Sequence, residues 1–148
     1  MVDTSLVRYF CDMVGFKKAG YINTSQKYKQ GVATTFTLNK KDWKKPGVYM
    51  FVSPDGEILK FGESRSLAHR LGVQYVSITN RTNNRIREAI KDKYNQIAFY
   101  FVETPKVDYK IGEFELEGSL QRELEEACIK KYKELNGGDL PELNFMIK

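Results

Sequence analysis

Histidine and cysteine are scarce in this chain of 148 residues, which has one histidine and two cysteines, Cys11 and Cys128. Neither cysteine belongs to a CxxC motif or a Cys/His cluster, and with one histidine in the whole chain a Cys/His zinc site is close to excluded. Mechanisms that use a Ser-His or Cys-His pair together with a second histidine are excluded as well. Two isolated cysteines on apolar helix faces predict reduced core residues in a cytosolic protein.

Long hydrophobic runs are also missing. The longest run, Ile97–Val102, has six residues, far short of the roughly 20 that a membrane-spanning helix needs. The N-terminus, Met1-Val2-Asp3, shows no basic segment followed by an apolar stretch, so an ordinary secretory signal is not expected. We therefore expect a cytoplasmic protein without a membrane partner.

The composition fits one compact domain. Hydrophobic residues make up 41% of the chain and charged residues 29%, and nine Phe, nine Tyr and one Trp are too many for a disordered chain. The formal charge of +5 is unevenly spread, because the segment from Lys17 to Lys45 holds eight lysines against one acid, Asp42. Aromatic residues interleave with these lysines: Tyr21, Tyr28, Phe36 and Trp43.

Basic residues mixed with aromatics are typical of nucleic-acid-binding surfaces, where cations contact phosphates and rings stack. The candidate nucleic-acid-binding residues are Lys44, Lys45, Arg65, Arg81, Arg85 and Arg87. A solvated lysine-rich surface explains the same charge without a partner, so charge alone indicates an anionic partner without establishing one.

The hydrophobic pattern predicts an α+β fold: a small antiparallel three-stranded sheet flanked by helices. Two strand-like runs, 48–52 and 57–61, are joined by Pro54-Asp55-Gly56, a strong hairpin signal. Further elements are expected as a first helix ending at Gly15, a strand at 33–38 among lysine-rich loops, a short helix after Ser64 or Ser66, a helix from Asn83 or Asn84, a strand at 97–103 and a long helix at 113–135. Residues 1–45 are expected to form a helical and basic N-terminal extension, within the same domain as a core at 46–148.

The last expected helix singles out one glutamate. At about 100° per residue from Leu120, the predicted core stripe holds Leu116, Leu120, Leu124, Ala127, Cys128 and Leu135. Glu123, Glu126 and Glu134 fall on a solvated face. Glu125 falls instead between Tyr132 and Ile129, and a carboxylate among apolar neighbours needs a partner such as a divalent cation.

Five short motifs now occur in a recognisable order. They are Gly47-Val48-Tyr49, Leu59-Lys60-Phe61-Gly62, Ser66-Leu67-Ala68-His69-Arg70-Leu71, the helix 124–130 and Pro141-Glu142-Leu143-Asn144. Together they resemble the core of the GIY-YIG nuclease superfamily. The tyrosine usual in the second motif is Lys60 here, which resembles certain small Type II restriction enzymes. Glu63 stands where a basic residue often follows the glycine of the second motif. Tyr75 comes five residues after Arg70, one residue later than usual.

The resemblance implies a stand-alone, metal-dependent endonuclease, of restriction or phage type, that hydrolyses phosphodiester bonds in double-stranded DNA. It implies that Tyr49 is the general base, that Lys60 tunes it, and that Arg70 and Tyr75 hold the phosphate. A lysine close to a tyrosine favours the phenolate form, a better base. Glu125 would bind Mg²⁺ or Mn²⁺, and Asn144 would support the site. His69 falls opposite the apolar stripe and is expected to be exposed.

Two alternatives stay open. The lost second-motif tyrosine and Glu63 favour a catalytically weakened module that binds DNA or a protein without cutting, whereas the presence of Tyr49, Arg70 and Glu125 favours an active enzyme. An RNA-directed or repair nuclease would share the chemistry with a different partner. One active site per chain predicts a homodimer, or two successive nicks, for a double-strand cut.

Overall fold

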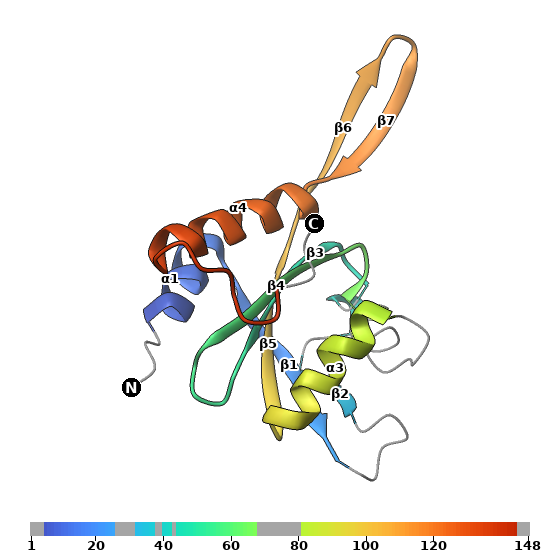
Figure 1. The fold of residues 1–148 in the computed structure, drawn as a ribbon. Helices are drawn as coiled ribbons and strands as arrows, with labels where there is room; N and C mark the ends of the chain where they lie inside the picture. The colour runs from blue at the N-terminus through green and yellow to red at the C-terminus, as the bar shows by residue number, and fades with distance from the viewer. Residues whose placement is uncertain (1–4, 26–31, 38–39, 43, 68–80, 145–148) are drawn as a thin grey trace.

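The fold is a five-stranded antiparallel sheet with helices on both faces, from which a separate two-stranded ribbon projects (Figure 1). This computed structural model describes residues 5–25, 32–37, 40–42, 44–67 and 81–144. The expected α+β class is confirmed, but the sheet has five strands where three were expected. Within the described residues, no helix has both the length and the apolar character that crossing a membrane requires.

The strands of the sheet lie in the order β2-β1-β5-β3-β4. Their bounds are Lys17–Thr24 for β1, Val32–Phe36 for β2, Gly47–Val52 for β3, Ile58–Ser64 for β4 and Gln96–Glu103 for β5. The predicted hairpin is confirmed as β3 and β4, and Gly56 at its turn has a φ of 89°. This hairpin leaves β4 at the edge of the sheet.

The sequence pattern missed β1, which pairs with both β2 and β5 and adds two strands to the expected sheet. Its buried apolar side chains, Ala19 and Ile22, are three positions apart. An irregularity in the pairing with β5 falls at Ala19, and such a bulge breaks the strict alternation by which a strand is recognised.

Three α-helices occur in the described residues: α1 (Ser5–Val14), α3 (Arg81–Lys93) and α4 (Gln121–Leu135); a short 3-10 helix spans Lys40–Asp42. As expected, α1 ends at Gly15, whose φ is 98°. Helices α1 and α4 cover one face of the sheet, around Phe10, Phe61 and Tyr132. Helix α3 covers the other face, where Ile90 joins the buried side chains of β1, β3 and β5. The sheet therefore separates two apolar layers.

The long helix expected from Glu113 is wrong in its first part. Residues 106–119 instead form the ribbon, with β6 at Lys106–Ile111 and β7 at Phe114–Ser119. The turn between them contains Gly112, whose φ of 62° suits the first central position of a tight hairpin turn. Apolar residues alternate with charged ones on both sides of this glycine, and that period-2 pattern overrides the local helical spacing.

This correction also rotates the buried face of α4. Leu116 and Leu120 precede the helix and are exposed, so they do not belong to the predicted core stripe. The side chains that α4 buries are Gln121, Cys128 and Tyr132. The buried face is therefore turned toward Glu125, which is half-buried at its border.

Candidate functional site

Tyr49 lies in the middle of β3 with its ring folded onto Gly62 of β4. The two residues are cross-strand partners, and Tyr49 is 2% exposed. A Cβ atom on Gly62 would lie only 2.2 Å from the Tyr49 hydroxyl oxygen and 2.1 Å from Cζ. Phe51 flanks the ring, with centroids 5.0 Å apart. The glycine of the second motif thus provides the space that the tyrosine of the first motif occupies.

Lys60 shares the sheet face of Tyr49. It pairs with Phe51 across the hairpin, and paired residues in an antiparallel ladder project to the same side. Its side chain is half-buried. The structure therefore brings Tyr49, Lys60 and Gly62 together on adjacent strands.

The turn after β4 is ordered by a serine. The amide N–H of Ser66 donates to Ser64 Oγ at 2.9 Å, and that hydroxyl donates to the carbonyl oxygen of Ser66 at 2.6 Å. Such a side-chain bond two residues along the chain fixes a turn. The next residue, Leu67, is fully buried in the core cluster that also contains Tyr49. The rest of the short helix expected here lies outside the described residues.

A cleft of about 890 Å³ opens at the end of the sheet where β4 finishes and α4 begins. Lys44, Glu63, Arg65 and Gln121 are among its lining residues. Lys45, next to the cleft residue Lys44, forms ion pairs with Asp42 at 3.1 Å and Glu103 at 3.3 Å. Hydrogen bonds to these two carboxylates raise the pKa of Lys45. Of the predicted nucleic-acid contacts, Lys44 and Arg65 therefore lie in one cleft, while Lys45 is engaged with acids.

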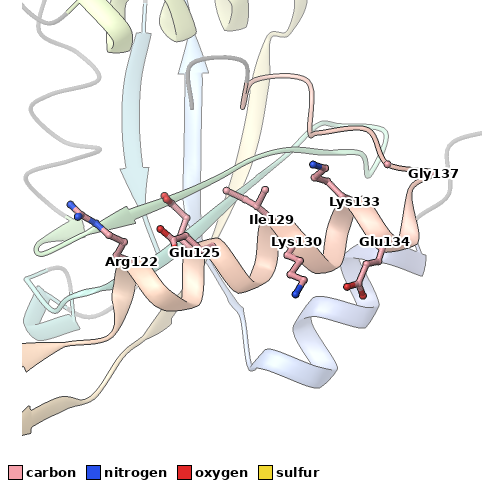
Figure 2. A pocket seen from close by; sticks show the side chains of 9 residues that line it. Arg122, Glu125, Ile129, Lys130, Lys133, Glu134 and Gly137 are labelled. Atoms are coloured by element: carbon pink, nitrogen blue, oxygen red, sulfur yellow. The ribbon is translucent and has the colours of Figure 1, made fainter. Parts of the chain in front are cut away.

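A groove of about 850 Å³ runs along α4 and contains Glu125. In Figure 2, Arg122, Glu125, Ile129 and Lys133 follow one another along one side of the helix, and Lys130 and Glu134 point the other way. Arg122 lines both the groove and the cleft, so the two hollows adjoin.

The surroundings of Glu125 combine burial with charge. Burial raises the pKa of the neighbouring Cys128 thiol to about 12, and the negative charge of Glu125 adds to that shift. Both cysteines are free, as expected, and Cys128 is in the core, whereas Cys11 is only half-buried. No group of three or more His, Cys, Asp or Glu side chains that could hold a metal occurs in the described part of the chain. A metal at Glu125 would therefore have fewer than three such ligands from these residues.

Of the remaining candidate arginines, only Arg87 has a described side chain. Arg87 of α3 is buried, and its Nη2 lies 3.6 Å from Glu88 Oε1. The charge pattern of the sequence, which suggested an exposed contact to nucleic acid, did not indicate this burial. Arg81 and Arg85 lie in the first two turns of α3, but their side chains lie outside the described part, as do Arg70 and Tyr75. The site roles of these residues remain predictions.

Asn144 is fully buried against the outer edge of β4. Its Nδ2 donates to the carbonyl oxygen of Phe61 and its Oδ1 accepts from the Phe61 amide, both at 2.9 Å. The amide of Leu143 also donates to the carbonyl oxygen of Leu59, at 2.7 Å. The segment 143–144 therefore pairs with the edge strand at the residues on either side of Lys60, a contact that no local sequence pattern indicates.

Comparison with known proteins finds similar folds among solved structures but no matching sequence family. No family model and no curated protein sequence matches the chain. Among solved structures, a mutant of EndoII from bacteriophage T4 is similar with a TM-score of 0.63 and 13% identity, over 85% of this chain and 93% of that one. The restriction endonuclease HPY188I in complex with product DNA is similar with a TM-score of 0.62 and 14% identity, over 99% of this chain and 87% of that one. The chain therefore has a fold found in two nucleases.

Proposed function

We propose that this protein is a metal-dependent DNA endonuclease of the GIY-YIG superfamily. The observation that carries the proposal is the packing of Tyr49 onto Gly62, with Lys60 on the same face of the same hairpin. The first and second motifs thus meet in space, within a fold shared with a phage endonuclease and a restriction endonuclease.

Tyr49 is the proposed general base, and it takes a proton from the attacking water through its hydroxyl oxygen. The tight packing against Gly62 and Phe51 holds the ring in one orientation. The ammonium group of Lys60 favours the phenolate and contacts the phosphate. Arg70 and Tyr75 keep the role that the resemblance implies, which is to hold the phosphate oxygens.

Glu125 is the proposed ligand of a single Mg²⁺ or Mn²⁺. A lone carboxylate fits this type of ion, because Mg²⁺ keeps several waters and is often completed by substrate phosphate oxygens. When bound, the ion would stabilise the charge that develops on the leaving oxygen. The proposal is supported by the half-buried position of Glu125 in the groove along α4, which adjoins the cleft at the end of β4.

The cleft at the end of the sheet is the proposed path of double-stranded DNA. Lys44 and Arg65 line it, and strand β1 of the same sheet begins with Lys17 and Lys18. One structural neighbour is in complex with product DNA, which supports DNA as the partner. Arg81, Arg85 and Lys45 are proposed as further backbone contacts.

The test is cleavage of supercoiled plasmid with Mg²⁺, with Mn²⁺ and with EDTA. We expect cleavage with either metal and none with EDTA. The variant Glu125→Gln should cut slower by roughly 100-fold or more, the loss typical when one electrostatic stabiliser of a transition state is removed. Its affinity for DNA, measured by mobility shift, should stay within about threefold, since phosphate contacts by Lys and Arg dominate affinity.

Glu126→Gln is the matched control, because Glu126 neighbours Glu125 on α4 but is exposed. It should cut at the wild-type rate. Wild-type cleavage by Glu125→Gln would contradict the assigned role of Glu125. DNA binding without cleavage in any metal would instead favour the alternative of a weakened binding module. Discrete fragments would indicate a restriction-type enzyme, and a smear a degradative one.

A further inference from the structure

The projecting ribbon has two faces of opposite character. Cross-strand partners share a face, so Tyr109 lies beside Leu116 and Ile111 beside Phe114. One face is apolar and consists of Val107, Tyr109, Ile111, Phe114, Leu116 and Gly118. The opposite face consists of Lys106, Asp108, Lys110, Glu115, Glu117 and Ser119. A lone two-stranded ribbon of this kind is marginally stable in water unless its apolar face packs against something.

The apolar face is uncovered in the single chain. The ribbon extends away from the body (Figure 1), and Tyr109, Ile111 and Phe114 are 48%, 62% and 65% exposed. The ring of Tyr109 lies along the face, where it passes 3.4 Å from the position of a Cβ on Gly118. A contiguous exposed apolar patch on a soluble protein marks an interaction surface.

The charge of the ribbon does not suit nucleic acid. Residues 106–119 hold two lysines against four acids, whereas the whole chain has a net charge of +5. Each lysine is matched across the ribbon, Lys106 with Glu117 at 3.4 Å and Lys110 with Glu115 at 3.8 Å. The acidic excess would repel a phosphate backbone, and the apolar face offers no cation to it.

We propose that the apolar face of the ribbon packs on the same face of the ribbon of a second copy of this chain. More than half of the exposed large hydrophobic residues in the described part of the chain lie on this face, so another copy of it is the best-matched apolar surface that the protein offers. A twofold axis lets one patch pair with itself. Two such ribbons would stack about 10 Å apart, as the sheets of a sandwich do, with their charged faces outward.

The base of the ribbon supports the same arrangement. Leu120, which joins β7 to α4, is exposed at 38% and continues the apolar surface toward the body. The ribbon face is about 20 Å long and smaller than a standard interface of about 800 Å² per partner. The contact therefore extends onto Leu120, and dissociation in the micromolar range is expected.

The test is the oligomeric state by sedimentation velocity, from about 1 to 100 µM, a range that brackets micromolar dissociation. The wild-type chain should form a dimer at the upper concentrations. The double variant Ile111→Lys with Phe114→Glu should remain a monomer throughout. These two residues are cross-strand partners, so the substitution keeps the net charge and allows a new pair within the ribbon.

The matched control is Lys110→Glu with Glu115→Lys, which reverses one ion pair on the outer face and also keeps the net charge. It should dimerise like the wild type. If the double variant fails to fold by circular dichroism, replacement of residues 107–118 with a short Gly-Ser linker makes the same test. A monomeric wild type at the upper concentrations would overturn the proposal. So would a double variant or linker variant that dimerises like the wild type. The measurement uses neither DNA nor metal, so it is independent of the proposed endonuclease function.

Discussion

At the scale of single residues, the candidate site depends on a glycine, Gly62, that leaves space for an aromatic ring. Gly62 is required because the Tyr49 ring occupies the volume where any Cβ would lie. A Cβ on Gly47 would likewise lie 2.6 Å from Cζ of Phe101, and only 2.1 Å from the carbonyl oxygen of Val102. The glycines of the two short motifs therefore have a steric cause, which is the close approach of an aromatic ring from the neighbouring strand.

Gly62→Ala should lower the free energy of unfolding by about 1–3 kcal/mol, the usual cost of overpacking a filled core. The reason is the overlap of the new methyl group with the Tyr49 ring. Urea denaturation measures the effect, with Tyr49→Leu and the double variant completing a mutant cycle. The cost of the alanine should shrink in the Tyr49→Leu background, because the ring is gone. An equal cost in both backgrounds would show that the ring is not the cause.

At the scale of elements, the C-terminal segment acts as a partner for the open edge of the sheet. An edge strand presents unpaired amide and carbonyl groups, and these must be satisfied when they are buried. The side chain of Asn144 satisfies both groups of Phe61, between Lys60 and Gly62. Asn144 therefore fixes the position of β4, and under the proposed function it is a positioning residue for the site.

Asn144→Ala should lower the free energy of unfolding by about 2–4 kcal/mol, because two buried hydrogen bonds are lost and both Phe61 groups are left unpaired. Thermal unfolding measures the loss. Asn136→Ala is the control, since Asn136 Nδ2 makes only a 3.3 Å bond to the Tyr132 hydroxyl, and its cost should stay below about 1 kcal/mol. A positioning role also predicts reduced cleavage with an unchanged metal requirement at temperatures where the variant is folded. Equal Tm losses for the two variants would contradict this account.

At the scale of the whole molecule, the two proposals meet in the question of how both DNA strands are cut. Under the proposed function one chain provides one Tyr49 and one Glu125, so a monomer would make one nick per encounter. A dimer joined through the ribbons would present two sites to one duplex. The base of the ribbon adjoins the proposed DNA cleft, because Lys106, Glu117, Gly118 and Ser119 are among the residues that line it.

The Ile111→Lys, Phe114→Glu variant should therefore separate nicking from double-strand cleavage. Nicked plasmid should form within about twofold of the wild-type rate, because phosphate contacts and the site are unchanged. Linear product should lag, since it then requires two independent nicks. Gel quantification of both products over time gives the ratio, with the Lys110→Glu, Glu115→Lys variant as control. Linear product that forms as early as with the wild type would argue against cutting by the paired sites.

The sequence predicted some elements well because their signals are local. The β3–β4 hairpin is an example, since Pro54-Asp55-Gly56 fixes a turn between two alternating runs. The ribbon was missed because Leu116 and Leu120 continue the helical spacing of α4, although Gly112 between alternating residues marks a hairpin. The face of α4 was misjudged for the same reason, and this error placed Glu125 farther from the buried side than it is.

The sequence by itself determined the class of fold, the absence of a Cys/His metal site, and the order of motifs that indicates a nuclease. These follow from composition and from neighbours along the chain. Only the tertiary structure decided that Tyr49 rests on Gly62, that Asn144 closes the edge of β4, and that residues 106–119 leave the body with an apolar face. Each of these depends on strand register or on contacts between distant segments, and such contacts are fixed by the packing of the whole chain rather than by any local pattern.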